Sequence, residues 1–279
     1  MAKQATDVLV VGGGVMGCAV ALRLAQAGLR PTVLERSIPG AEASSVAAGI
    51  LGPAMEATAD GPMLRLGIES RERHAALAEE LRTSHGIDVG FRRSGLLAIA
   101  LDEAEATALR ARASMLEAAG ISARLLDAAE TRAIEPGCNA EVLLGLELPD
   151  EAQLDPRALL PALSIAAERA GATFRTGSTV RGILRDGDRV RGVSVDDGNL
   201  EAPRVVVAAG SWTTLVPGLD LPASTVHPVR GQIVATRTRP PVFRRIVFGA
   251  GGYVVTRPDG RVLCGSTVEH VGFQREVTV

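Results

Sequence analysis

Short apolar runs, separated by glycine-rich turns and amphipathic stretches, give the chain an alternating pattern of predicted strands and helices. Asp7–Val11 is apolar and ends in glycines, as expected for a strand buried on both faces. A helix is predicted from these glycines to about Ala27, and a second strand over Pro31–Arg36. Strand, helix and strand in this order form one βαβ unit, so we predict a parallel sheet.

The middle of the chain is predicted to be mostly helical. Met63–His85 is a charged amphipathic stretch that ends at a glycine. Asp102–Ala119 begins with a capping-box-like pair, and Asp155–Ala170 begins with aspartate followed by proline; both patterns are typical of helix starts. Between the second strand and these helices, Ser37–Ala59 is rich in Gly, Ala and Ser and is predicted to be a long loop.

The last third of the chain is predicted to be mostly β-structure. Arg204–Ala209 is a second strand of the buried type, again followed by glycine. Beyond Pro217 we expect antiparallel strands, including Pro228–Thr236. A hairpin is predicted to join Tyr253–Thr256 to Val262–Ser266 around a Pro-Asp-Gly turn.

Composition narrows the class of protein. At roughly 150 residues per domain, 279 residues correspond to about two domains. Hydrophobic residues make up 46% and charged residues 22%, which excludes a disordered or fibrous chain. A net charge of -2 argues against nucleic acid as a partner. No apolar run approaches the roughly 18 residues of a membrane span, so none is predicted.

Localisation is predicted from the N-terminus and the cysteines. Met1–Asp7 leads directly into the first strand without the apolar region of a signal peptide. The three cysteines, Cys18, Cys138 and Cys264, are not closely spaced, which favours a reducing compartment without disulfides. We therefore expect a cytoplasmic protein.

The glycines after the first strand match the pattern G-x-G-x-x-G. Gly12 permits the tight turn, Gly14 lets the backbone approach a pyrophosphate, and Gly17 allows close packing of helix on strand. Glu35, at the end of the second strand, can accept hydrogen bonds from ribose hydroxyls, and its charge disfavours NADP. This context predicts dinucleotide binding, and the motif by itself leaves NAD and FAD open.

The other chemically capable residues carry weaker signals. The four histidines, His74, His85, His227 and His270, have no metal-ligand spacing with each other or with the cysteines. Cys18 lies early in the first helix, where a helix dipole could lower its thiol pKa, although packing against the sheet is the favoured role.

Four segments, in order after the glycine motif, carry a family resemblance. Ala43–Pro53, Arg204–Trp212, Val226–Gln232 and Gly252–Thr267 resemble the D-amino-acid-oxidase-like family of flavoproteins. Within that family they are most similar to the glycine oxidase branch of thiamine biosynthesis, over essentially the whole chain. The resemblance implies FAD as cofactor. It is expected to be noncovalent, because no cysteine matches the position that binds flavin covalently in sarcosine oxidases.

The resemblance also implies which residues contact FAD. They lie at the helix start, at the end of the second strand, in the small-residue loop, near the adenine and after the late buried strand. Short side chains suit such contacts because backbone N–H groups can then approach the flavin. For the tryptophan, a core position and a cofactor contact are equally weighted. With Gly12, Gly14 and Gly17, the implied residues are Val15, Met16, Glu35, Arg36, Ser44, Ser45, Ala48, Gly49, Ile50, Val180, Ala208, Ala209, Gly210 and Trp212.

Three residues are assigned to catalysis by the same resemblance. Tyr253, the only tyrosine, would lie over the flavin face and help to hold a substrate carboxylate. Val268 would form part of an apolar substrate wall, and Ile50 would lie beside the isoalloxazine. Arg230 and Arg257 are alternative carboxylate anchors, although solvated charges at strand edges are the favoured interpretation.

The implied reaction is oxidation of the amine of glycine or a similar small amino acid. Hydride would pass to the flavin, the imine would hydrolyse to a keto acid and ammonia, and O2 would reoxidise the flavin to give hydrogen peroxide. Sarcosine oxidase, a quinone-coupled D-amino-acid dehydrogenase and a hydroxy-acid oxidase are alternatives within the flavin class. An NAD-linked dehydrogenase and a non-catalytic fragment are alternatives outside it.

The expected fold is α/β, with a Rossmann-like FAD domain of the GR2 type and a second α+β domain on an antiparallel sheet. The predicted FAD domain takes residues 1–86 and 147–215, and the substrate domain takes 87–146 and 216–279. A homo-oligomer is possible. The chain stops where the family returns to its FAD domain and supplies an arginine for the substrate carboxylate. We therefore expect a truncated gene product that binds FAD weakly and turns over poorly.

Overall fold

The computed structural model describes residues 6–249 and 251–278. The helices are α1 Val15–Gln26, α2 Ala43–Val46, α3 Pro53–Glu56, α4 Pro62–His85, α5 Glu103–Ala118, α6 Ala128–Ile134, α7 Pro156–Arg169 and the 3-10 helix η1 Gly210–Leu215. The strands are β1 Val8–Val11, β2 Pro31–Leu34, β3 Ile50–Leu51, β4 Leu96–Ala100, β5 Arg124–Asp127, β6 Leu144–Leu148, β7 Ala152–Gln153, β8 Thr173–Arg175, β9 Val180–Asp186, β10 Arg189–Val195, β11 Gly198–Glu201, β12 Val205–Val207, β13 Ile233–Arg237, β14 Ile246–Gly249, β15 Gly252–Thr256 and β16 Arg261–Gly265.

The first sheet is the predicted parallel one. Its four strands lie in the order β12-β1-β2-β8, and every neighbouring pair is parallel. All four residues of β1 are buried, as the uninterrupted apolar run predicted. Because its strands are parallel, their carboxyl ends share one edge of the sheet, where α1 and the other connections begin.

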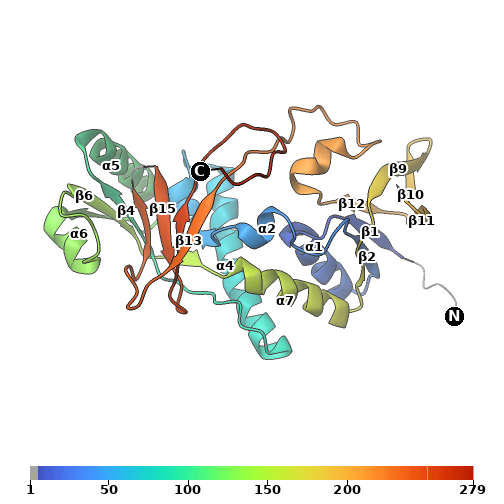
Figure 1. Cartoon of the computed structure of the whole chain (residues 1–279), viewed down its shortest axis with the longest axis horizontal. Coiled ribbons are helices and arrows are strands. Elements are labelled where there is room, and N and C mark those ends of the chain that lie inside the picture. Colours follow the sequence, from blue (N-terminus) through green and yellow to red (C-terminus); the bar gives the residue numbers. More distant parts are fainter. Residues whose placement is uncertain (1–5, 250, 279) are drawn as a thin grey trace.

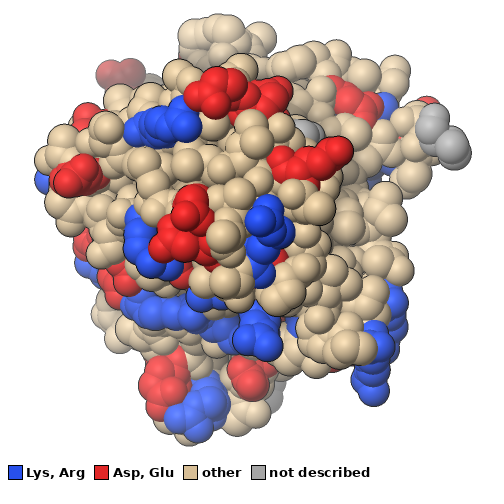
Figure 2. All heavy atoms as spheres, turned by 90° about the vertical axis from the view of Figure 1, so that its left-hand side faces the viewer, with Lys and Arg blue, Asp and Glu red and all other residues tan. Residues whose placement is uncertain are grey.

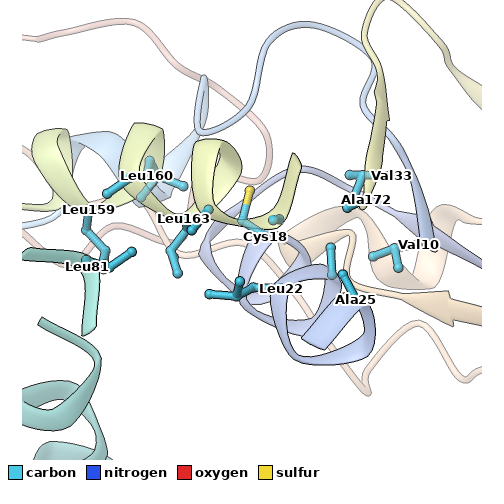
Figure 3. Close-up of a cluster of buried hydrophobic side chains, with 14 of the residues drawn as sticks. Val10, Cys18, Leu22, Ala25, Val33, Leu81, Leu159, Leu160, Leu163 and Ala172 are labelled. Atoms are coloured by element: carbon cyan, nitrogen blue, oxygen red, sulfur yellow. The ribbon is translucent and has the colours of Figure 1, made fainter. Parts of the chain in front are cut away.

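An aliphatic core joins this sheet to its helices. Cys18 and Leu22 of α1 face Leu163 of α7, while Val10 and Val33 come from the two central strands (Figure 3). Side chains in this cluster are at most 7% exposed. Burial of each valine or leucine in this cluster stabilises the fold by roughly 1.5–3 kcal/mol, so the glycine loop between β1 and α1 is supported by a well-packed core.

A larger sheet of seven strands has the order β13-β16-β15-β14-β4-β6-β5. Figure 1 shows it and the parallel sheet toward opposite ends of the long axis, with α1, α4 and α7 between them. The predicted hairpin is present, with Tyr253 opposite Gly265. The prediction of a purely antiparallel sheet is wrong at one place: β14 pairs with β4 in parallel, Val247 opposite Leu97.

Two smaller β-units complete the fold. Strands β9, β10 and β11 form an antiparallel sheet, connected by tight turns at Gly187–Asp188 and Asp196–Asp197. The predicted loop at Ser37–Ala59 contains the short helices α2 and α3 and the strand β3, which pairs with β7. The prediction of a long loop is thus corrected, since pairing with the distant strand β7 orders part of this segment.

The described helices include none long and apolar enough to cross a membrane. On the face that Figure 2 shows, acidic and basic side chains are interspersed rather than gathered by sign. The division into domains at residues 87, 147 and 216 stays a prediction, and residue 147 lies inside β6.

Candidate active site

A cavity of about 740 Å³ opens at the carboxyl edge of the parallel sheet. Val11, Leu34 and Val207, the last residues of β1, β2 and β12, contribute to its wall. Ligands of open α/β sheets bind at this edge, and the volume lies within the roughly 300–1,000 Å³ common for small-molecule sites. The topology of the sheet therefore places a nucleotide-sized cavity where the glycine motif predicts one.

Gly17 fixes how closely α1 approaches the turn that precedes it. A Cβ atom at this position would lie 1.9 Å from the carbonyl oxygen of Gly12, far inside van der Waals contact. A side chain here must therefore displace the backbone of the glycine loop. Gly17 does not line the cavity, and its observed role is the close packing that the motif predicts.

Glu35 is 8% exposed and bonds to the backbone of two loops. Its Oε2 accepts a hydrogen bond from the Gly13 N–H at 2.8 Å, and its Oε1 accepts one from the Ser37 N–H at 2.8 Å. Each carboxylate oxygen can accept another bond, so contact with a ribose remains available. The structure adds a role that the motif did not reveal: Glu35 holds the glycine loop against the end of β2.

The N-terminus of α1 offers donors to an anion. Ser44 Oγ accepts a hydrogen bond from the Val15 N–H at 3.1 Å. Within the described residues, the N–H groups of Gly14 and Met16 form no hydrogen bond. Free N–H groups together with the positive end of the helix dipole suit a phosphate.

Of the residues predicted to bind the cofactor, most gather around this one cavity. Four of them do not line it: Ser45 lies in α2, Ile50 begins β3, and Ala48 and Gly49 lie between these two elements. Sequence reasoning missed Ser178 and Thr179, whose only signal is the turn before β9. The predicted residues that line the cavity are Gly12, Gly14, Val15, Met16, Glu35, Arg36, Ser44, Val180, Ala208, Ala209, Gly210 and Trp212.

Trp212, on η1, forms part of the cavity wall and is half-buried. The guanidinium carbon of Arg36 lies 4.0 Å from the centre of its ring, within cation–π range. The ring of Phe273 lies 5.4 Å away. Arg36 also pairs with Glu42 at 2.5 Å. The indole is therefore held in place by its neighbours while it lines the cavity, and its contact with a cofactor stays a prediction.

The residues assigned to catalysis lie apart from this cavity. Tyr253 packs against Phe248, with ring centres 5.6 Å apart, and burial raises the pKa of its hydroxyl. Ile50 packs against the same apolar cluster as Tyr253. Val268 is 72% exposed. Within the described residues, Tyr253 and Ile50 thus pack against one apolar cluster, and Val268 lies outside it.

The two alternative carboxylate anchors are not the solvated charges that the sequence suggested. Arg257 is 3% exposed and donates to Gln153 Oε1 at 2.8 Å and to the Ala48 carbonyl. Arg230 is half-buried and pairs with Glu269. The expectation fails because each side chain is held by residues that are remote in sequence but close in the fold.

A buried ion pair lies behind the segment between β3 and α3. Arg71 of α4 donates to Glu151 Oε1 at 3.2 Å, and both residues are at most 6% exposed. The same Oε1 accepts from the Ala54 N–H at 3.1 Å, while no hydrogen bond to Oε2 occurs within the described residues. Burial raises the pKa of Glu151 to about 7 in spite of Arg71.

The remaining candidates carry structural roles. Cys18 is fully buried and donates to the Gly13 carbonyl at 3.3 Å; burial raises its thiol pKa to about 12, which confirms the packing role. The described part of the chain contains no cluster of three or more His, Cys, Asp or Glu side chains able to hold a metal ion.

Comparison with known proteins agrees with this architecture. Residues 7–279 match the DAO family model, described as FAD dependent oxidoreductase. The glycine oxidase of Geobacillus kaustophilus is 35% identical over 98% of this chain and 72% of its own length. A crystal structure of glycine oxidase from that organism superposes with a TM-score of 0.91 and 33% identity, over 99% of this chain and 75% of the other.

A bifunctional protein ThiO/ThiG of Synechocystis sp. is 36% identical over 98% of this chain. The chain spans 40% of the length of that relative.

Proposed function

This chain belongs to the DAO family of FAD-dependent oxidoreductases, and from that premise we propose that it oxidises the amine of glycine or a similar small amino acid. The family favours FAD over the NAD-linked alternative. The single observation that carries the proposal is the cavity at the carboxyl edge of the sheet, with its free N–H donors and apolar walls. A role in thiamine biosynthesis, which the resemblance implies, is part of the same proposal.

The residues around the cavity fit a dinucleotide. The free N–H groups at the start of α1 would hold the pyrophosphate, and Glu35 would accept from the adenosine ribose. Arg36 and Trp212 would enclose the adenosine end. None of the three cysteines lines the cavity, in keeping with noncovalent binding.

FAD, when bound, supplies the hydride acceptor for amine oxidation, with O2 as the final acceptor giving hydrogen peroxide. The chain's own contribution would be to orient a small amino acid and to exclude water. Tyr253 would contact the substrate carboxylate through its hydroxyl, whose pKa is raised by burial. Ile50 and Val268 would provide apolar contact beside it.

The proposal is tested by peroxide release from the FAD-supplemented protein with glycine, sarcosine and D-alanine. We expect turnover on glycine to exceed turnover on the other two, and Tyr253→Phe to raise KM more than it lowers kcat. Val242→Ala, an exposed position outside the cavity, serves as control. If the folded, FAD-bound protein releases no peroxide with any of the three substrates, the proposed function is wrong.

A further inference from the structure

Arg257 is a buried cation with no carboxylate bonded to it. It follows β15 at the turn of the hairpin and is 3% exposed. Its two hydrogen bonds go to neutral acceptors, Gln153 Oε1 and the Ala48 carbonyl, and the described residues offer it no ion pair. Asp155, close by, pairs instead with Arg261. Burying a charge in this way is costly, so a role beyond hairpin stability is indicated.

The partner of Arg257 in the first half of the chain is a single peptide group. Arg257 bonds to the carbonyl of Ala48, and the N–H and C=O of a planar trans peptide point in opposite directions. The Gly49 N–H therefore points away from the guanidinium. It forms no hydrogen bond within the described residues, so it is a free donor.

Gly49 is tightly enclosed on the side of Arg257. Its φ is +71°, and a Cβ atom would lie 2.1 Å from the Leu154 carbonyl oxygen and 2.9 Å from Arg257 Nη2. The Gly49 carbonyl is itself fixed, because it accepts from the Leu154 N–H at 3.0 Å. The carbonyls of Ala48 and Gly49, on either side of the free N–H, are thus both held by hydrogen bonds within the protein.

We propose that Arg257 is a positioning residue that fixes the Ala48–Gly49 peptide and keeps the Gly49 N–H directed outward as a donor to the flavin. The inference rests on the proposed function for the identity of the acceptor. Arg257 lies four residues after Tyr253. Its bond to the Ala48 carbonyl therefore also connects β15, which carries Tyr253, to the Ala48–Gly49 peptide. It touches neither substrate nor cofactor itself.

The hairpin turn offers a matched control. Arg261 is half-buried and docks the same turn on the start of α7 through Asp155, but it does not bond to Ala48. Arg257→Met and Arg261→Met therefore both loosen the hairpin, and only the first frees the Ala48–Gly49 peptide. Arg257→Lys keeps the charge but loses the planar fork that bridges two acceptors.

Two measurements are made on each variant. Hydrogen exchange of the amides in β3 and at Leu154 reports whether the loop is held, with or without FAD. Titration with FAD gives the Kd from flavin fluorescence. For Arg257→Met we expect these amides to exchange at least tenfold faster and the Kd for FAD to rise about tenfold. Arg257→Lys is expected to give values between those of Arg257→Met and the parent chain. Arg261→Met is expected to change either quantity less than twofold.

Unchanged exchange or an unchanged Kd in folded Arg257→Met overturns the proposal, as does an equal effect of Arg261→Met. If Arg257→Met does not fold, the same criteria apply to Arg257→Lys, with a threefold change expected. Failure of the parent chain to bind FAD would defeat the proposed function instead. The exchange comparison would then still decide whether Arg257 holds the loop.

Discussion

The two ends of the molecule hold their functional loops by different means. Beside the parallel sheet, the glycine loop is fixed by close backbone contacts and by hydrogen bonds between main chain and the side chains of Glu35 and Ser44. Beside the large sheet, the segment from Ala48 to Ala54 is fixed by the buried ions Arg257 and Glu151.

The difference predicts different vulnerabilities. A loop held by close backbone contacts fails when side-chain volume is added. A segment held by buried charges responds to protonation and to loss of a partner. The cofactor cavity should therefore be sensitive to steric change, and the neighbouring segment to electrostatic change.

The largest expected effect is that of Gly17→Ala. A methyl group would collide with the Gly12 carbonyl, which outweighs the roughly 1 kcal/mol that alanine gains over glycine inside a helix. We expect a loss of about 3 kcal/mol in the free energy of unfolding and no measurable FAD binding. Gly61→Ala, at the N-cap of α4 with no atom near its Cβ, should cost less than about 1 kcal/mol and leave binding intact.

The second prediction concerns pH. Because the pKa of Glu151 rises from 4.5 to about 7 on folding, the folded chain holds this proton more tightly than the unfolded chain. The resulting stabilisation is complete below pH 4.5 and is lost as the pH rises to about 7. Its size is about 3 kcal/mol. Glu151→Gln should remove this pH dependence from the free energy of unfolding measured in urea.

The exposed Glu103→Gln provides the control for that experiment, since within the described residues the Glu103 side chain pairs with Arg110 alone, at the surface. Its unfolding profile between pH 5 and 8 should run parallel to that of the parent chain. A Glu151→Gln profile parallel to the parent would show that the carboxyl group ionises normally in the fold.

The smallest expected effect comes from the cavity wall. Trp212→Leu should raise the FAD Kd about fivefold, because a flat wall ordered by Arg36 is replaced by a smaller side chain. Phe273→Leu, on a ring that contacts Trp212 but does not line the cavity, should change the Kd less than twofold. Isothermal titration of FAD into each protein measures both.

Sequence reasoning succeeded where structure is local. The glycine motif, the strand before it and the helix after it lie within twenty residues, so their geometry follows from chain order. Contacts between remote segments could not be predicted. Arg257 lies 209 residues from Ala48 in sequence, and its burial depends on a hairpin docking there. The parallel pairing of β14 with β4 was missed for the same reason.

The central claim is that the cavity at the carboxyl edge of the parallel sheet binds FAD. It is tested most directly by titrating FAD into the purified chain while flavin fluorescence and visible absorbance are recorded. We predict saturable one-to-one binding that Gly17→Ala abolishes and Gly61→Ala preserves. A folded chain that shows no saturable binding, or a Gly17→Ala variant that binds FAD like the parent, would contradict it.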